Sequence, residues 1–61
     1  YEGSDRQTRG AILRVLRTHG AFPADEVIAG WPDAAQRDRA IDSLIADGLA
    51  EASHGLLRLP A

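Results

Sequence analysis

Three breaks made of glycine and proline divide this chain into segments too short for anything but a small domain. Gly20 and Gly48 each follow a run with helical spacing, where a left-handed residue commonly ends a helix. Between them, the tripeptide Gly30-Trp31-Pro32 interrupts the pattern again. We therefore expect a single domain over residues 1–61. So short a chain buries only about 60% of the surface that its unfolded form exposes, and its stability is marginal.

The spacing of apolar residues predicts three helices between these breaks. Two of them begin with a capping-box pair, and the other starts at a proline, which suits the first turn of a helix. The expected helices are residues 5–19, capped by Ser4 with Gln7 three residues later, residues 23–29 from Pro23, and residues 34–47, capped by Asp33 with Gln36 three residues later.

The last part of the sequence predicts a β-hairpin. Residues 49–52 and 56–60 flank the turn-rich tripeptide Ser53-His54-Gly55, and Ala21 with Phe22 forms a short extended link earlier in the chain. This order predicts a mostly α fold, a winged helix-turn-helix with three helices plus a two-stranded wing. The core residues that we expect are Ile12, Leu16, Trp31, Ile41, Leu44 and Ile45.

Residue types that carry catalysis or bind metals are scarce. The sequence has no cysteine and only two histidines, His19 and His54, neither at ligand spacing from another. The carboxylates of the last helix scatter around it instead of converging, and no phosphate-binding loop or nucleophile elbow is present. We expect no catalytic residue, no metal, no cofactor and no small-molecule substrate. No apolar run is long enough for a membrane span.

Positive charge is concentrated in the first expected helix, where four arginines face one aspartate. Residues 33–47 carry two arginines and four aspartates, so the last helix neutralises few phosphates. Its polar side chains still have the chemistry to contact base edges. The arginines of the first helix have two interpretations, an ordinary solvated face or a surface for DNA backbone or a partner. The candidate DNA-binding residues are Arg6, Arg14, Arg17, Gln36, Arg39 and Ser43.

Two strings of residues resemble one known family. They are Asp-Arg-Gln-Thr-Arg-Gly over residues 5–10 and Trp-Pro-Asp-Ala-Ala-Gln-Arg-Asp-Arg-Ala over residues 31–40. Together with the rest of the chain, they resemble the C-terminal tail of MutY-type adenine DNA glycosylases from actinobacteria. The chain starts at Tyr1 and has no methionine, so we expect a fragment of a longer protein.

The resemblance implies a parent enzyme that removes adenine opposite 8-oxoguanine in base-excision repair, in the bacterial cytoplasm at the nucleoid. It also implies a [4Fe–4S] cluster in that parent. Because the catalytic and cluster residues of that parent are missing here, we expect this chain to be a non-catalytic accessory domain. Its expected partners are double-stranded DNA, bound weakly because few phosphates are neutralised, and the parent's catalytic core. The resemblance leaves open whether the domain reads the lesion, grips the flanking duplex or docks on the core. Two alternatives stay open: a protein-interaction or structural module docked on that core, and a fragment of a winged-helix transcriptional regulator.

Overall fold

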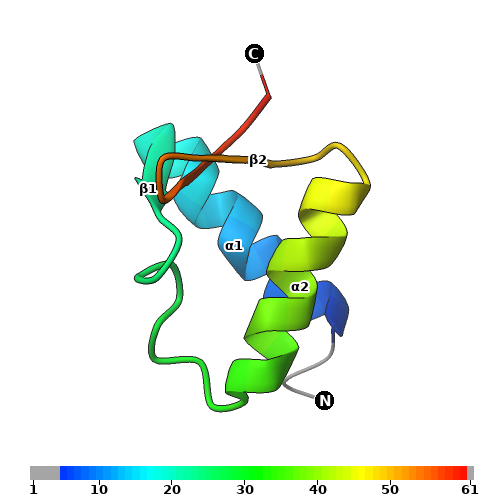
Figure 1. Ribbon diagram of the computed structural model, residues 1–61. Coiled ribbons are helices and arrows are strands. Elements are labelled where there is room, and N and C mark those ends of the chain that lie inside the picture. The colour runs from blue at the N-terminus through cyan, green and yellow to red at the C-terminus, as the bar shows by residue number, and fades with distance from the viewer. Residues whose placement is uncertain (1–4, 61) are drawn as a thin grey trace.

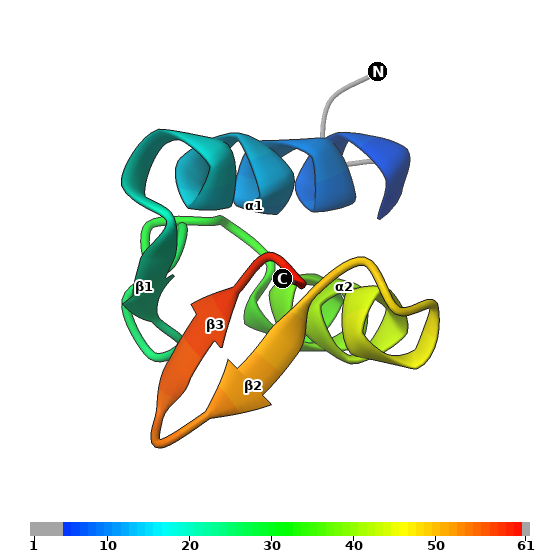
Figure 2. The ribbon, with the colours of Figure 1, turned by 90° about the horizontal axis from the view of Figure 1, so that it is seen from above.

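The computed structural model describes residues 5–60, which form two helices and three short strands (Figure 1). The order along the chain is α1 (Asp5–His19), β1 (Ala21–Pro23), α2 (Ala34–Ala46), β2 (Glu51–Ser53) and β3 (Leu56–Arg58). Seen from above, α1 forms one layer, and α2 with the sheet forms the other (Figure 2). Both helices face a small core between the layers.

The two helices occupy the segments that the sequence predicts. Helix α1 ends before Gly20 and α2 ends just before Gly48, and these glycines have φ angles of 81° and 77°. An L-residue with a side chain adopts this left-handed region only at a cost, which explains why glycine follows each helix. The carboxylate of Asp33 accepts a hydrogen bond of 3.0 Å from the backbone N–H of Gln36 and caps α2. The predicted cap at Ser4 lies outside the described residues.

The predicted helix at residues 23–29 is wrong, because a chain of turns occupies residues 24–30. The amides of Glu26, Ala29 and Trp31 donate to the carbonyl three residues before each of them. Ile28 has a φ of 44°, a conformation that a helix cannot contain. So short a segment gains too few hydrogen bonds to repay helix nucleation.

The Arg37 side chain supplies donors that a helix would otherwise provide to this segment. Its Nε donates to the Val27 carbonyl oxygen at 2.7 Å, and its Nη2 donates to the carbonyl oxygen of Ala24. In a helix, those two carbonyls would accept from the amides of Ile28 and Trp31. The guanidinium therefore satisfies the carbonyls while the backbone stays irregular.

The sheet also differs from the expected two-stranded wing, because it has three antiparallel strands in the order β1-β3-β2. The predicted hairpin is present as β2 and β3. The segment expected as an extended link is a third strand, with Phe22 opposite Leu57 and Pro23 opposite Leu56. Since β1 lies at the edge of the sheet, the missing N–H of Pro23 is tolerated there. The prediction of three helices plus a two-stranded wing is therefore wrong.

The core agrees with the prediction at three of its six expected positions. Ile12, Leu16 and Leu44 are fully buried, whereas Ile41 and Trp31 are half-buried, and Ile45 is 38% exposed. Ile45 turns outward because α2 directs its buried side along every third or fourth residue. The residues that complete the buried set are Thr8, Val27, Gln36, Ala40, Ala50 and Leu57.

Candidate nucleic-acid interface

The side of α1 opposite the core carries three arginines around a glycine. Thr8, Ile12 and Leu16 are the buried residues of this helix. At 3.6 residues per turn, the opposite side presents a set that we call the arginine face of α1: Arg6, Gly10, Arg14 and Arg17. From Arg6 to Arg17 this face extends about 16 Å along the helix. Figure 2 shows α1 as a layer of its own, and the arginine face lies on the side of this helix opposite its buried residues.

The three arginine side chains of this face are exposed and have no acidic partner within residues 5–60. The remaining arginine of α1, Arg9, is different: its Nη2 lies 2.9 Å from the Oδ2 of Asp47, at the end of α2. The arginines are thus divided by the fold. Arg9 serves the contact between the helices, whereas the charges of the other three are not neutralised by any acidic residue among those that the structure describes.

Two arginines outside α1 are also paired. The Nη1 of Arg37 lies 3.2 Å from the Oδ1 of Asp38, and only 13% of the arginine side chain is exposed. The Nε of Arg58 lies 3.4 Å from the Oε1 of Glu51, across the hairpin. Like the arginines of the arginine face, Arg39 is exposed and has no acidic partner among the described residues.

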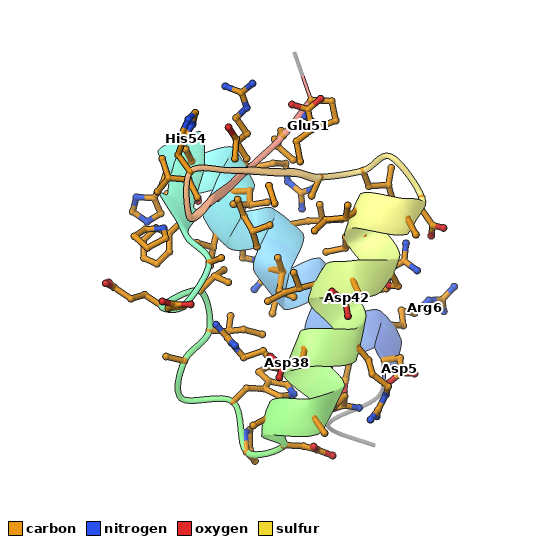
Figure 3. The ribbon with its side chains drawn as sticks, viewed as in Figure 1. Asp5, Arg6, Asp38, Asp42, Glu51 and His54 are labelled. Atoms are coloured by element: carbon orange, nitrogen blue, oxygen red, sulfur yellow. The ribbon has the colours of Figure 1, made fainter. Side chains whose placement is uncertain are left out.

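The outward side of α2 is acidic. Asp38 and Asp42 are exposed there, and Figure 3 shows both on the side of α2 turned away from α1. Figure 3 also shows Arg6 at the start of α1. The domain therefore has a positive side on α1 and a negative side on α2. A DNA phosphate is attracted to the first and repelled by the second.

The structure separates the six candidate DNA-binding residues into two groups. Four are exposed: Arg6, Arg14, Arg17 and Arg39. Gln36 is only 9% exposed, and its side-chain amide forms hydrogen bonds with Trp31 and Asp5. The Ser43 hydroxyl is half-buried and donates to the Ala40 carbonyl oxygen at 3.1 Å. Gln36 and Ser43 thus lie on the side of α2 that packs into the domain, and they do not share a surface with the exposed arginines of α1.

Helical spacing did not predict that Gln36 is buried. Trp31, five residues earlier in the sequence, is a signal that could have predicted it. The indole Nε1 donates to Gln36 Oε1 at 2.9 Å, and Gln36 Nε2 donates to Asp5 Oδ1 at 3.1 Å. Arg37 was likewise not recognised as a structural residue. No local pattern signals it, because its carbonyl partners lie 10 and 13 residues away.

Other kinds of site have little support among residues 5–60. No group of three or more histidine, cysteine or acidic side chains is placed to hold a metal ion. Neither α1 nor α2 combines the length and the hydrophobicity that crossing a bilayer requires. The arginine face of α1 is therefore the surface feature that most favours a ligand.

The fold and this face define a small helical domain with one cationic side. Comparison with curated proteins relates it to the adenine DNA glycosylases. It is 51% identical to that of Mycolicibacterium smegmatis over 53 residues, which cover 84% of this chain and 18% of the relative. It is 52% identical to that of Mycobacterium tuberculosis H37Rv over 52 residues, or 80% of this chain and 17% of the relative.

The chain is therefore a homologue of a segment of mycobacterial adenine DNA glycosylases, consistent with a fragment of the MutY type. It spans only 17–18% of the length of these relatives. No family model matches the sequence, and no solved structure matches it.

Proposed function

We propose that this chain is a non-catalytic accessory domain of an adenine DNA glycosylase and that it helps the enzyme to hold duplex DNA. The homology supports the parent enzyme and its place in base-excision repair. The observation that carries the DNA-binding role is the arginine face of α1, whose three arginines are exposed and free of acidic partners within residues 5–60.

The binding is electrostatic in this proposal. Each arginine that neutralises a phosphate releases condensed counterions, and this release favours association. With three arginines on the arginine face of α1 and a fourth exposed arginine, Arg39, on α2, the domain contacts about three or four phosphates. Such a footprint gives affinities in the non-specific range of about 10⁻⁴ to 10⁻⁶ M. The interaction is useful because the parent holds the domain close to the duplex, which raises its effective concentration.

Helix α2 does not lie deep in the major groove in this proposal. Asp38 and Asp42 occupy its outward side, and they would meet the phosphates on either side of the groove. Gln36, the side chain on α2 best suited to adenine, is buried in the domain. The domain therefore contributes affinity, and the rest of the parent recognises the mispair.

Adenine excision belongs to the rest of the parent in this proposal. A [4Fe–4S] cluster requires cysteine ligands, and this sequence has none, so its residues do not fit that cofactor. The purified chain should release no adenine from a duplex that pairs adenine with 8-oxoguanine. Release of free adenine would overturn the non-catalytic assignment.

An NMR titration of the isotopically labelled chain with duplex DNA tests the proposal. Amide shifts should be concentrated along α1, and they should be the same with and without the mispair. The matched control is the Arg14→Ala/Arg17→Ala variant, which should shift much less at equal DNA concentration. Unshifted α1 amides at millimolar DNA would overturn DNA binding and favour docking of this face on the parent's catalytic core.

A further inference from the structure

Gly10 lies in the interior of α1, at the centre of the arginine face. Glycine weakens a helix interior, because its backbone loses more conformational freedom on folding than that of any other residue. A domain of this size has little stability in reserve. The presence of glycine at this position therefore needs a reason.

The fold of the described residues supplies no such reason. A Cβ atom built on Gly10 meets no heavy atom within 4 Å beyond its chain neighbours and the adjacent backbone of its own helix, so an alanine would fit without any movement. Nor does the backbone require glycine there, since Gly10 is in the middle of a regular helix. Gly20, Gly48 and Gly55 differ in this respect, because their φ angles of 81°, 77° and 78° lie in the left-handed region.

The surroundings of Gly10 indicate a role in binding. Arg6 precedes it by four residues and Arg14 follows it by four, so each lies about 6 Å away along the helix axis on the same side. Arg17 extends the row by one more turn. The long guanidinium side chains stand on both sides of a position that has no side chain. Between them, Gly10 itself is half-buried, and the space where its side chain would stand is empty.

We propose that Gly10 is the point of closest approach between α1 and DNA. A sugar–phosphate segment lies over Gly10, and Arg6 and Arg14 contact the phosphates on either side of it. This inference rests on the proposed function and adds the docking position to it. Glycine commonly occurs where a ligand has to come close to the protein backbone. A side chain at position 10 would hold the duplex away and lengthen the arginine–phosphate contacts.

The test compares Gly10→Ala and Gly10→Leu with the wild-type chain in thermal melting and in DNA titrations. Gly10→Ala should raise Tm by roughly 2–8 °C, because it removes the helix penalty of glycine. Gly10→Leu should weaken binding to a duplex by about tenfold or more, although it changes no charge. Ala35→Leu is the matched control. It adds a leucine at an exposed position of α2, and it should leave the affinity unchanged.

The outcomes separate this inference from the proposed function. If Gly10→Leu binds the duplex as tightly as the wild-type chain while Arg14→Ala/Arg17→Ala loses binding, the inference is wrong and the proposed function stands. If the double variant binds like the wild-type chain, both are wrong. A fall in Tm for Gly10→Ala would show a structural need for glycine and overturn the inference. Binding of poly-glutamate but not of the duplex would also overturn the inference, because it would assign the face to an acidic protein surface.

Discussion

The indole Nε1–H of Trp31 donates a hydrogen bond of 2.9 Å to the side-chain oxygen of Gln36. The same amide donates through its nitrogen to the carboxylate of Asp5, at the start of α1. One buried side chain thereby joins the loop before α2 to both helices. A buried polar group of this kind stabilises a fold only while its partners are present.

Replacement of Gln36 should therefore destabilise the domain. Gln36→Ala leaves the Trp31 N–H without its acceptor, and we expect a loss of about 1–3 kcal/mol in the free energy of unfolding. Urea titration followed by the fluorescence of Trp31, the single tryptophan, measures it. The exposed neighbour Arg39 provides the control, and Arg39→Ala should change stability by no more than about 0.5 kcal/mol. Equal stability of the two variants would contradict a structural role for Gln36.

Two consecutive residues of α2 should respond very differently to truncation. Leu44 is fully buried, whereas Ile45 is 38% exposed. Leu44→Ala should cost about 2–5 kcal/mol because it leaves a cavity in the core, and that is enough to unfold much of so small a domain. Ile45→Ala should cost less than about 1 kcal/mol. Thermal melting of both variants checks this, and a larger loss for Ile45→Ala would place the core on the wrong side of α2.

Both helices were predictable from the sequence because their signals are local. The spacing of apolar residues, the cap at Asp33 and the left-handed glycines Gly20 and Gly48 all act within one or two turns. The turn segment was not predictable in this way. Its irregular backbone depends on Arg37, which is distant in sequence, and the pairing of β1 with β3 joins residues more than 30 positions apart. Helix propensity at residues 23–29 yields to these tertiary contacts.

The candidate interface was predictable to the extent that it depends on charge. The excess of arginine in residues 5–19 is visible in the sequence, and the burial of Thr8, Ile12 and Leu16 follows the expected period. Which arginines have acidic partners is not visible there. The pairing of Arg9 with Asp47 spans 38 residues and depends on how the helices cross. The choice between Gln36 as a surface residue and as a buried one depends on the same crossing.

The hairpin turn offers a stabilising substitution. His54 and Gly55 have φ angles of 53° and 78°, as the two central residues of a type I′ turn do. Asparagine adopts this conformation more readily than histidine, so His54→Asn should stabilise the domain by about 0.5–1 kcal/mol. Gly55→Ala should destabilise it by about 1–2 kcal/mol for the opposite reason. Chemical denaturation of both variants tests this, and a loss of stability in His54→Asn would contradict the turn assignment.

The salt dependence of DNA binding should count the arginines that contact phosphates. Log affinity falls with log salt by about 0.9 for each neutralised phosphate, so three or four contacts give a slope of about −3. Arg14→Ala/Arg17→Ala should reduce the steepness of that slope by about 2. Arg58→Ala is the control, because Arg58 is paired with Glu51 and lies on the hairpin, and its slope should match that of the wild-type chain. Fluorescence anisotropy with a labelled duplex between 50 and 200 mM salt, roughly the range over which such contacts are lost, measures all three slopes. If Arg58→Ala reduced the slope as much as the double variant does, the charge of the whole domain would bind DNA, and the arginine face of α1 would have no special role.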